Sequence, residues 1–169
     1  MQRRGFLKLG LASAAVLAVA GGAVALLQPG LAGGRLTAPA REVFASAGRA
    51  VLDGSLPAEP AAQQAAVQGL LDRIDVLVAA LPPHAQDELS QLLSLLATAP
   101  GRRMLAGLGT GWHEASVAQV QAALQEMRVS AVALRQQAYL ALHDIANGAY
   151  FSEPATWGQL GYPGPRSVA

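Results

Sequence analysis

An apolar seam in the C-terminal half of the sequence constrains the fold more than any other feature. Between residues 114 and 147, apolar residues recur at alternating spacings of three and four, the period of a helix packed along a bundle seam. The members of this seam are Val117, Val120, Leu124, Met127, Ala131, Leu134, Ala138, Ala141 and Ile145. The pattern predicts one long helix over residues 114–147, with Asn147-Gly148 as its C-terminal cap.

Shorter helices are predicted ahead of this seam, over residues 37–52, 61–81, 83–97 and 102–108. Proline and glycine separate them, because both residues interrupt helices. The composition agrees: 52% of residues are apolar, only 5% are aromatic, and alanine and leucine, both strong helix formers, dominate. No run alternates with a period of two, so no sheet is expected. The sequence predicts an all-α fold, a small helical bundle with one long C-terminal helix and an irregular tail.

The composition also excludes several kinds of chemistry. A formal net charge of +1 offers no basic field for nucleic acid. The chain has no cysteine and only 3 histidines, so thiolate metal sites are excluded and no metal-ligand spacing is present. Nucleotide-binding and hydrolase motifs are missing as well. We therefore expect no catalytic, metal or cofactor site in this chain.

The N-terminus has the layout of a secretory signal, in which a charged start precedes an uncharged apolar stretch over residues 9–27. The charged start resembles the twin-arginine (Tat) consensus, with Gln2 in place of the usual Ser or Thr. The residues that carry this resemblance are Arg3, Arg4, Phe6, Leu7 and Lys8. It implies the Tat translocase as a partner and export to the periplasm in a folded state.

Two positions suit removal of this signal, after Ala32 with Gly30 at −3 or after Ala40 with Ala38 at −3. The apolar stretch is also just long enough to cross a bilayer. The segment is therefore either cut off or kept as an inner-membrane anchor that supplies membrane contact. We divide the chain into a signal at 1–32, a helical bundle at 33–148 and a tail at 149–169.

Aromatic residues gather in that tail, where proline and glycine exclude a continuous helix. Tryptophan and tyrosine are preferred anchors at protein interfaces, so the tail either covers its own bundle or docks on a partner. We expect its start to pack on the bundle and its end to dock. The candidate docking residues are Tyr150, Phe151, Pro154, Trp157, Tyr162 and Pro163.

A polar and aromatic stripe runs beside the seam of the long helix. Its members, at helical spacing, are Arg128, Arg135, Tyr139 and His143. The stripe is either an ordinary solvated face or a second docking site. The remaining interpretation is a catalytic role for His143 with Asp144 and Tyr139, although no nucleophile or cofactor motif accompanies these residues.

The end of the chain resembles the Tat-exported small proteins similar to gluconate 2-dehydrogenase subunit 3. The residues that match the motif of that family are Tyr150, Phe151, Pro154, Trp157, Gly161, Tyr162, Pro163 and Gly164. Glu153 stands where the family has Asn or Asp, and the glycine-rich insertion between the proline and the tryptophan is missing. The chain therefore resembles a shorter branch, and the substrate does not carry over.

The resemblance implies a non-catalytic small subunit of an oxidoreductase complex. Its partner would be an FAD-dependent large subunit of the glucose-methanol-choline class, with a cytochrome c subunit or a quinone accepting the electrons. The small subunit would escort that flavoprotein through Tat and stabilise it in the periplasm. The alternative is a free-standing helical binding or scaffold protein, periplasmic or membrane-anchored.

Overall fold

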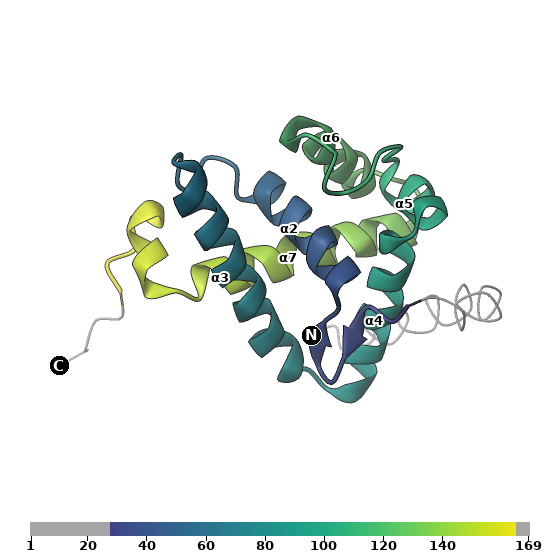
Figure 1. The fold of residues 1–169 in the computed structure, drawn as a ribbon, viewed down its shortest axis with the longest axis horizontal. Coiled ribbons are helices and arrows are strands. Elements are labelled where there is room, and N and C mark those ends of the chain that lie inside the picture. Colours follow the sequence, from purple (N-terminus) through teal and green to yellow (C-terminus); the bar gives the residue numbers. More distant parts are fainter. Residues whose placement is uncertain (1–27, 165–169) are drawn as a thin grey trace.

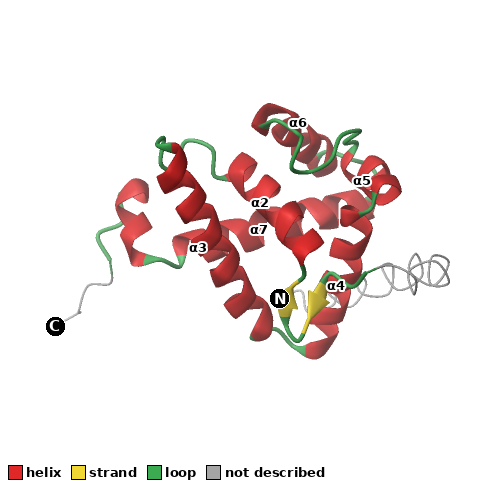
Figure 2. Ribbon diagram, viewed as in Figure 1, coloured by secondary structure: helices red, strands yellow, loops and turns green. Residues whose placement is uncertain are grey.

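The computed structural model describes residues 28–164, and its regular structure is almost entirely helical (Figures 1 and 2). In chain order the elements are β1 (Leu31–Ala32), β2 (Arg35–Leu36), α2 (Ala38–Val51), α3 (Pro60–Ala79), α4 (Pro83–Ala97), α5 (Ala99–Ala106), α6 (Val117–Arg128), α7 (Ala133–Phe151) and the 3-10 helix η1 (Pro154–Leu160). The predicted small helical bundle is confirmed.

The expected Tat residues fall outside this range. They are Arg3, Arg4, Phe6, Leu7 and Lys8. Among the residues that the structure describes, no helix has the length and apolar character needed to cross a membrane.

Two short strands precede the first described helix, so the expectation of no sheet was wrong. β1 and β2 pair antiparallel, with Leu31 opposite Leu36. Gly33 and Gly34 form the turn between them with φ of 58° and 74°, a left-handed conformation that glycine adopts without strain. A ladder of two residues per strand is too short to produce the alternating pattern by which a strand is recognised in a sequence.

Two helices form the centre of the bundle. α2 packs against α3, α4, α6 and α7, and α7 packs against α2, α3, α5 and α6 (Figure 1). The core around them is mostly aliphatic, and its aromatic members are Phe44, Trp112 and Tyr150. Its largest fully buried members include Phe44, Leu70, Ile74, Leu93, Leu96, Met127 and Leu142.

Local hydrogen bonds set most of the helix ends. The Thr98 hydroxyl caps α5 by accepting the Gly101 N–H at 3.1 Å, and Gly107, at φ 72°, ends that helix. Ser116 and Gln119 form a reciprocal capping box at the start of α6. These signals are local in the sequence, which is why most of the predicted helix positions agree with the structure.

The single long helix over residues 114–147 was wrong, because the chain breaks between α6 and α7. Val129 ends α6 and Val132 is extended, with φ −87° and ψ 111°. Between them, the Ser130 hydroxyl accepts the Val132 N–H at 3.1 Å, a local bond that competes with the helix. The two valines add little helix propensity, because branching at Cβ restricts their rotamers.

The break shifts the buried face of the second helix. Ala131, expected in the seam, is exposed in the turn, and Ala141 is only half-buried. The residues of α7 that are buried are Ala138, Leu142, Ala146, Ala149 and Tyr150. The seam of α6 is kept, since Val120, Leu124 and Met127 are all buried. The predicted seam was therefore right in α6, whereas in α7 only Ala138 of its members is buried.

The expected cap at Asn147-Gly148 was also wrong, because α7 continues to Phe151. Ala149 and Tyr150 are buried, so one more helical turn places two apolar contacts on the bundle. The first residues assigned to the tail thus belong to the last helix.

The connection between α5 and α6 is fixed by Trp112. Its buried indole donates from Nε1 to the Leu96 carbonyl on α4 at 2.7 Å. Its own carbonyl accepts the Ser46 hydroxyl of α2 at 2.8 Å. One side chain and its backbone therefore join the glycine-rich loop to two helices.

Glu59 caps α3, and its charge should make stability depend on pH. Its two carboxylate oxygens accept the N–H groups of Ala61 and Ala62 at 3.0 and 2.6 Å, which holds the pKa of Glu59 below its ordinary value. A lowered pKa stabilises the fold above the unfolded-state pKa, and that stabilisation is lost as the pH falls through the folded-state pKa. We expect the melting temperature of the native protein to exceed that of Glu59→Gln at neutral pH and to approach it in acid. A difference that stays constant through the acid range would contradict this.

Candidate functional site

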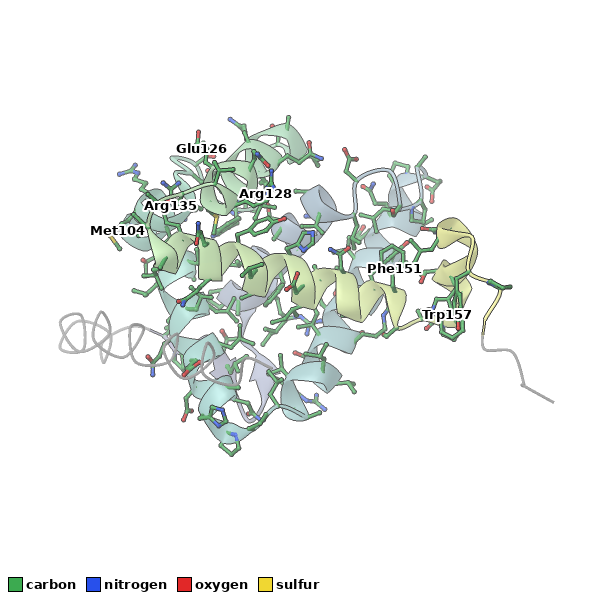
Figure 3. The ribbon with its side chains drawn as sticks, turned by 180° about the vertical axis from the view of Figure 1, so that it is seen from behind. Met104, Glu126, Arg128, Arg135, Phe151 and Trp157 are labelled. Atoms are coloured by element: carbon green, nitrogen blue, oxygen red, sulfur yellow. The ribbon has the colours of Figure 1, made fainter. Side chains whose placement is uncertain are left out.

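Exposed apolar side chains lie at both ends of α7, and one lies in its middle. Among the described residues, the large apolar side chains that stand open to solvent are Val76, Met104, Val129, Val132, Leu140, Leu160 and Tyr162. All of them except Val76 lie on α7, at one of its ends, or on α5, which packs against it. We call Met104, Val129, Val132, Leu140, Leu160 and Tyr162 the α7 surface. Figure 3 shows α7 crossing the molecule between two labelled groups of side chains, one at each end.

The N-terminal end of α7 is held by Arg135. Its Nε donates to the Leu105 carbonyl on α5 at 2.8 Å, and its Nη2 lies 3.8 Å from Glu126 on α6. This half-buried side chain therefore bridges three helices at the place where Met104 is exposed (Figure 3). Arg128 is exposed nearby, where its Nε donates to Gln125 at 3.0 Å within the same helix. Of the two arginines in the predicted stripe, Arg128 is the one that faces solvent.

The middle of α7 carries the rest of the predicted stripe. The rings of Tyr139 and His143 stack with their centroids 5.1 Å apart. His143 Nδ1 lies 2.8 Å from Asp144, and its Nε2 lies 3.1 Å from the Asn147 amide nitrogen. A carboxylate accepts and an amide nitrogen donates, so these contacts suit Nδ1 as the donor and Nε2 as the acceptor. Both ring nitrogens therefore have partners within α7, and the contacts order a polar row along the helix.

The start of the tail is anchored to the bundle. Tyr150 is buried, and its hydroxyl donates to the Ser55 carbonyl at 2.8 Å. Arg73 on α3 donates from Nε to the Ala149 carbonyl at 2.8 Å and lies 4.0 Å from Glu153. The ring of Phe151 meets that of Tyr150 edge-on at 5.1 Å and is half-buried. Tyr150 thus points into the bundle, although it was among the candidate docking residues.

The end of the tail forms a small structure of its own. Pro154 begins η1, and Trp157 donates from Nε1 to the Phe151 carbonyl at 2.8 Å. The rings of Trp157 and Tyr162 lie 5.3 Å apart. Pro163 follows, exposed, and η1 lies beyond the end of α7 in Figure 1. A short fold at the edge of the bundle therefore carries these rings, with Leu160 and Tyr162 open to solvent.

Sequence reasoning missed most of the α7 surface. The residues not foreseen are Met104, Val129, Val132, Leu140 and Leu160. Met104 and Leu140 could not be told from core residues, because an apolar side chain on a helix is usually buried. The two valines had a signal in Ser130 between them, since serine favours helix ends over helix interiors.

The described residues contain no group of three or more His, Asp or Glu arranged to hold a metal ion. Comparison of the chain with protein-family models, with curated proteins and with solved structures finds no match. The features of the chain that bear on function are therefore its sequence motifs and the geometry of α7 and the tail.

Proposed function

We propose that this chain is a non-catalytic small subunit that escorts a larger enzyme through the Tat pathway and stabilises it in the periplasm. The partner we propose is an FAD-dependent dehydrogenase of the glucose-methanol-choline class, which supplies the flavin chemistry. A cytochrome c subunit or a quinone would then take the electrons. This chain contributes the export signal at its N-terminus and a binding surface on its helical bundle.

The exposure of the α7 surface is the observation that carries the proposal. Its side chains are between 49% and 65% exposed, although each could make apolar contacts in an interface. Ordered polar groups accompany them, namely Arg128 at one end and the Tyr139–His143 stack in the middle. Protein interfaces combine exposed apolar side chains with polar groups in this way.

The tail supports the same partner at the other end of α7. The Trp157 indole donates to the Phe151 carbonyl and lies tilted against the Tyr162 ring, so both rings are already positioned before any contact. Positioning in advance reduces the entropy lost on binding. The sequence resemblance of this tail to the small-subunit family points to a flavoprotein as the partner.

Purification from the native host tests the proposal. A tag is attached through a long linker after the tail, and the purified material is examined by mass spectrometry and visible spectroscopy. We expect a yellow complex that contains a flavoprotein dehydrogenase. A colourless protein isolated alone from the periplasm or membrane would favour the free-standing binding or scaffold protein instead.

A matched pair of variants tests the α7 surface within that complex. Leu140→Glu places a charge in the proposed interface, and we expect it to weaken partner binding about 30-fold or more, because burying an unpaired charge is costly. Val76→Glu introduces the same charge at an exposed valine on α3, outside the α7 surface. Glutamate is a good helix former, so both variants should fold. Equal partner binding by the two variants would reject the α7 surface as the docking site.

A further inference from the structure

Arginines gather where the ends of three helices meet, and we call this group the basic end. Its members, on α5, α6 and the first turn of α7, are Arg102, Arg103, Arg128 and Arg135. Between residues 99 and 135 the acidic residues are Glu114 and Glu126. Glu114 belongs to the glycine-rich loop, where its carboxylate accepts the Gly111 N–H at 3.0 Å. Glu126 is therefore the acidic residue that accompanies the four arginines.

The helix ends that carry these arginines are in contact. Arg135 donates from Nε to the Leu105 carbonyl at 2.8 Å, and its Nη2 lies 3.8 Å from Glu126. A Cβ at Gly107, which ends α5, would lie 3.4 Å from Glu126 Oε2 and 3.8 Å from Arg135 Nη2. Figure 3 shows Arg128 and Arg135 at the same end of α7. Charged groups of three helices therefore lie in one region of the molecule.

Most of this positive charge is not neutralised within the described residues. Of the four arginines, Arg135 alone forms an ion pair there, and its partner Glu126 is 71% exposed, so water weakens the attraction. Arg103 and Arg128 are exposed and have no carboxylate partner in the described chain. Arg102 is half-buried, and its Nε has no hydrogen-bond partner there. The basic end therefore keeps a positive charge that a group outside this chain can pair.

Apolar side chains are exposed among these arginines. Met104 follows Arg103 directly, and Val129 follows Arg128 directly. Met104, Val129 and Val132 are each more than half exposed. Methionine and arginine are enriched in protein interfaces, and the planar guanidinium binds a carboxylate through two parallel hydrogen bonds. The chemistry that fits this surface is an apolar contact flanked by carboxylates.

We propose that the basic end binds an acidic segment of the partner protein, in which Asp and Glu residues flank an apolar side chain. The apolar side chain packs on Met104, and the carboxylates pair with Arg103 and Arg128. This inference rests on the proposed function for the existence of a partner, and it adds the charge of the surface that the partner presents.

An anionic membrane is the other kind of surface that attracts arginines. Proteins at a membrane place tryptophan and tyrosine at the level of the lipid headgroups. Here Trp157 lies in η1 and Tyr162 follows it, at the opposite end of α7 from the basic end (Figure 3). The separation of these rings from the arginines favours an acidic protein segment over a membrane.

Photo-cross-linking from Met104 tests the proposal in the full chain. A benzophenone amino acid replaces Met104 in the native host, and mass spectrometry identifies the peptide to which it becomes linked. We expect a peptide rich in Asp and Glu. Arg103→Gln combined with Arg128→Gln should lower the yield of this product about fivefold or more, because both ion pairs with the partner are lost.

A second double variant, Arg35→Gln combined with Arg49→Gln, is the matched control. It removes the same net charge at two arginines outside the basic end, neither of which forms an ion pair in the described chain. We expect it to give the native yield. Equal yields from the two double variants, or a linked peptide without acidic residues, would overturn the proposal.

Vesicles test the membrane directly. The full chain and both double variants are mixed with vesicles of phosphatidylglycerol and phosphatidylcholine, and with vesicles of phosphatidylcholine alone. Equal binding by the two double variants supports the protein segment. Weaker binding of Arg103→Gln with Arg128→Gln to the phosphatidylglycerol vesicles would overturn it in favour of a membrane contact.

This inference and the proposed function can fail separately. A yellow complex that forms without any cross-link from Met104 leaves the proposed function in place and rejects the acidic segment. An acidic peptide from a protein without flavin, linked in a yield that depends on Arg103 and Arg128, supports the acidic segment and rejects the flavoprotein as the partner.

Discussion

Trp112→Ala should lower the free energy of unfolding by about 3–5 kcal/mol, the usual cost of truncating a large buried aromatic side chain. The indole is buried in the core and donates to the Leu96 carbonyl on α4. Removing it leaves a cavity and a buried carbonyl without its donor. Chemical denaturation followed by circular dichroism measures the change.

Trp112→Phe separates the two parts of this effect. Phenylalanine keeps most of the apolar contact but cannot donate to Leu96, so we expect a loss of about 1–3 kcal/mol. A phenylalanine variant as unstable as the alanine variant would mean that the hydrogen bond, rather than the packing, dominates. If the alanine variant unfolds with a free energy within about 1 kcal/mol of the native value, Trp112 does not stabilise the core as described.

Tyr150→Ala should be similarly damaging, with a loss of about 3–5 kcal/mol, because this ring anchors the last turn of α7. The hydroxyl donates to Ser55, and the ring packs edge-on against Phe151. Tyr150→Phe keeps the ring and removes one hydrogen bond, so we expect a loss of about 1 kcal/mol. Denaturation of the two variants beside the native protein gives both values.

The same pair distinguishes an anchor from a docking residue. If Tyr150 acts only within the bundle, Tyr150→Phe binds the proposed partner as tightly as the native chain. Trp157→Ala serves as the comparison, since it alters the end of the tail and should weaken partner binding while changing the stability of the bundle little. A loss of binding in Tyr150→Phe that exceeds its loss of stability would show that the hydroxyl meets the partner.

The helices that could be predicted are those whose signals are local. Pro83 lies at the start of α4, and the apolar spacing of Val67, Leu70 and Ile74 gives the buried face of α3. The break at Val129–Val132 could not be found in the same way, because it interrupts an apolar period that runs on past it. The local signals for the break are Ser130, whose hydroxyl accepts the Val132 N–H, and the two valines, and the longer apolar period outweighs them.

The candidate site was predictable in composition but not in orientation. The aromatic cluster of the tail was visible, yet its members divide between the interior, where Tyr150 lies, and the surface, where Tyr162 lies. Residue type does not decide between these places, because both suit an amphipathic ring. The hydrogen-bond partner of each hydroxyl or indole N–H decides whether the ring lies inside or outside. For Tyr150 that partner, the Ser55 carbonyl, is 95 residues away along the chain.

The central position of α7 has a consequence for the order in which the molecule can assemble during synthesis. α7 is the last α-helix in the described chain, yet α2, α3, α5 and α6 all rest against it. A nascent chain that stops before residue 133 lacks α7, so the apolar faces that α7 covers on those helices stay exposed. The bundle can therefore be completed only after translation is nearly finished. Until α7 leaves the ribosome, exposed apolar helix faces distinguish an unfinished chain from a finished one.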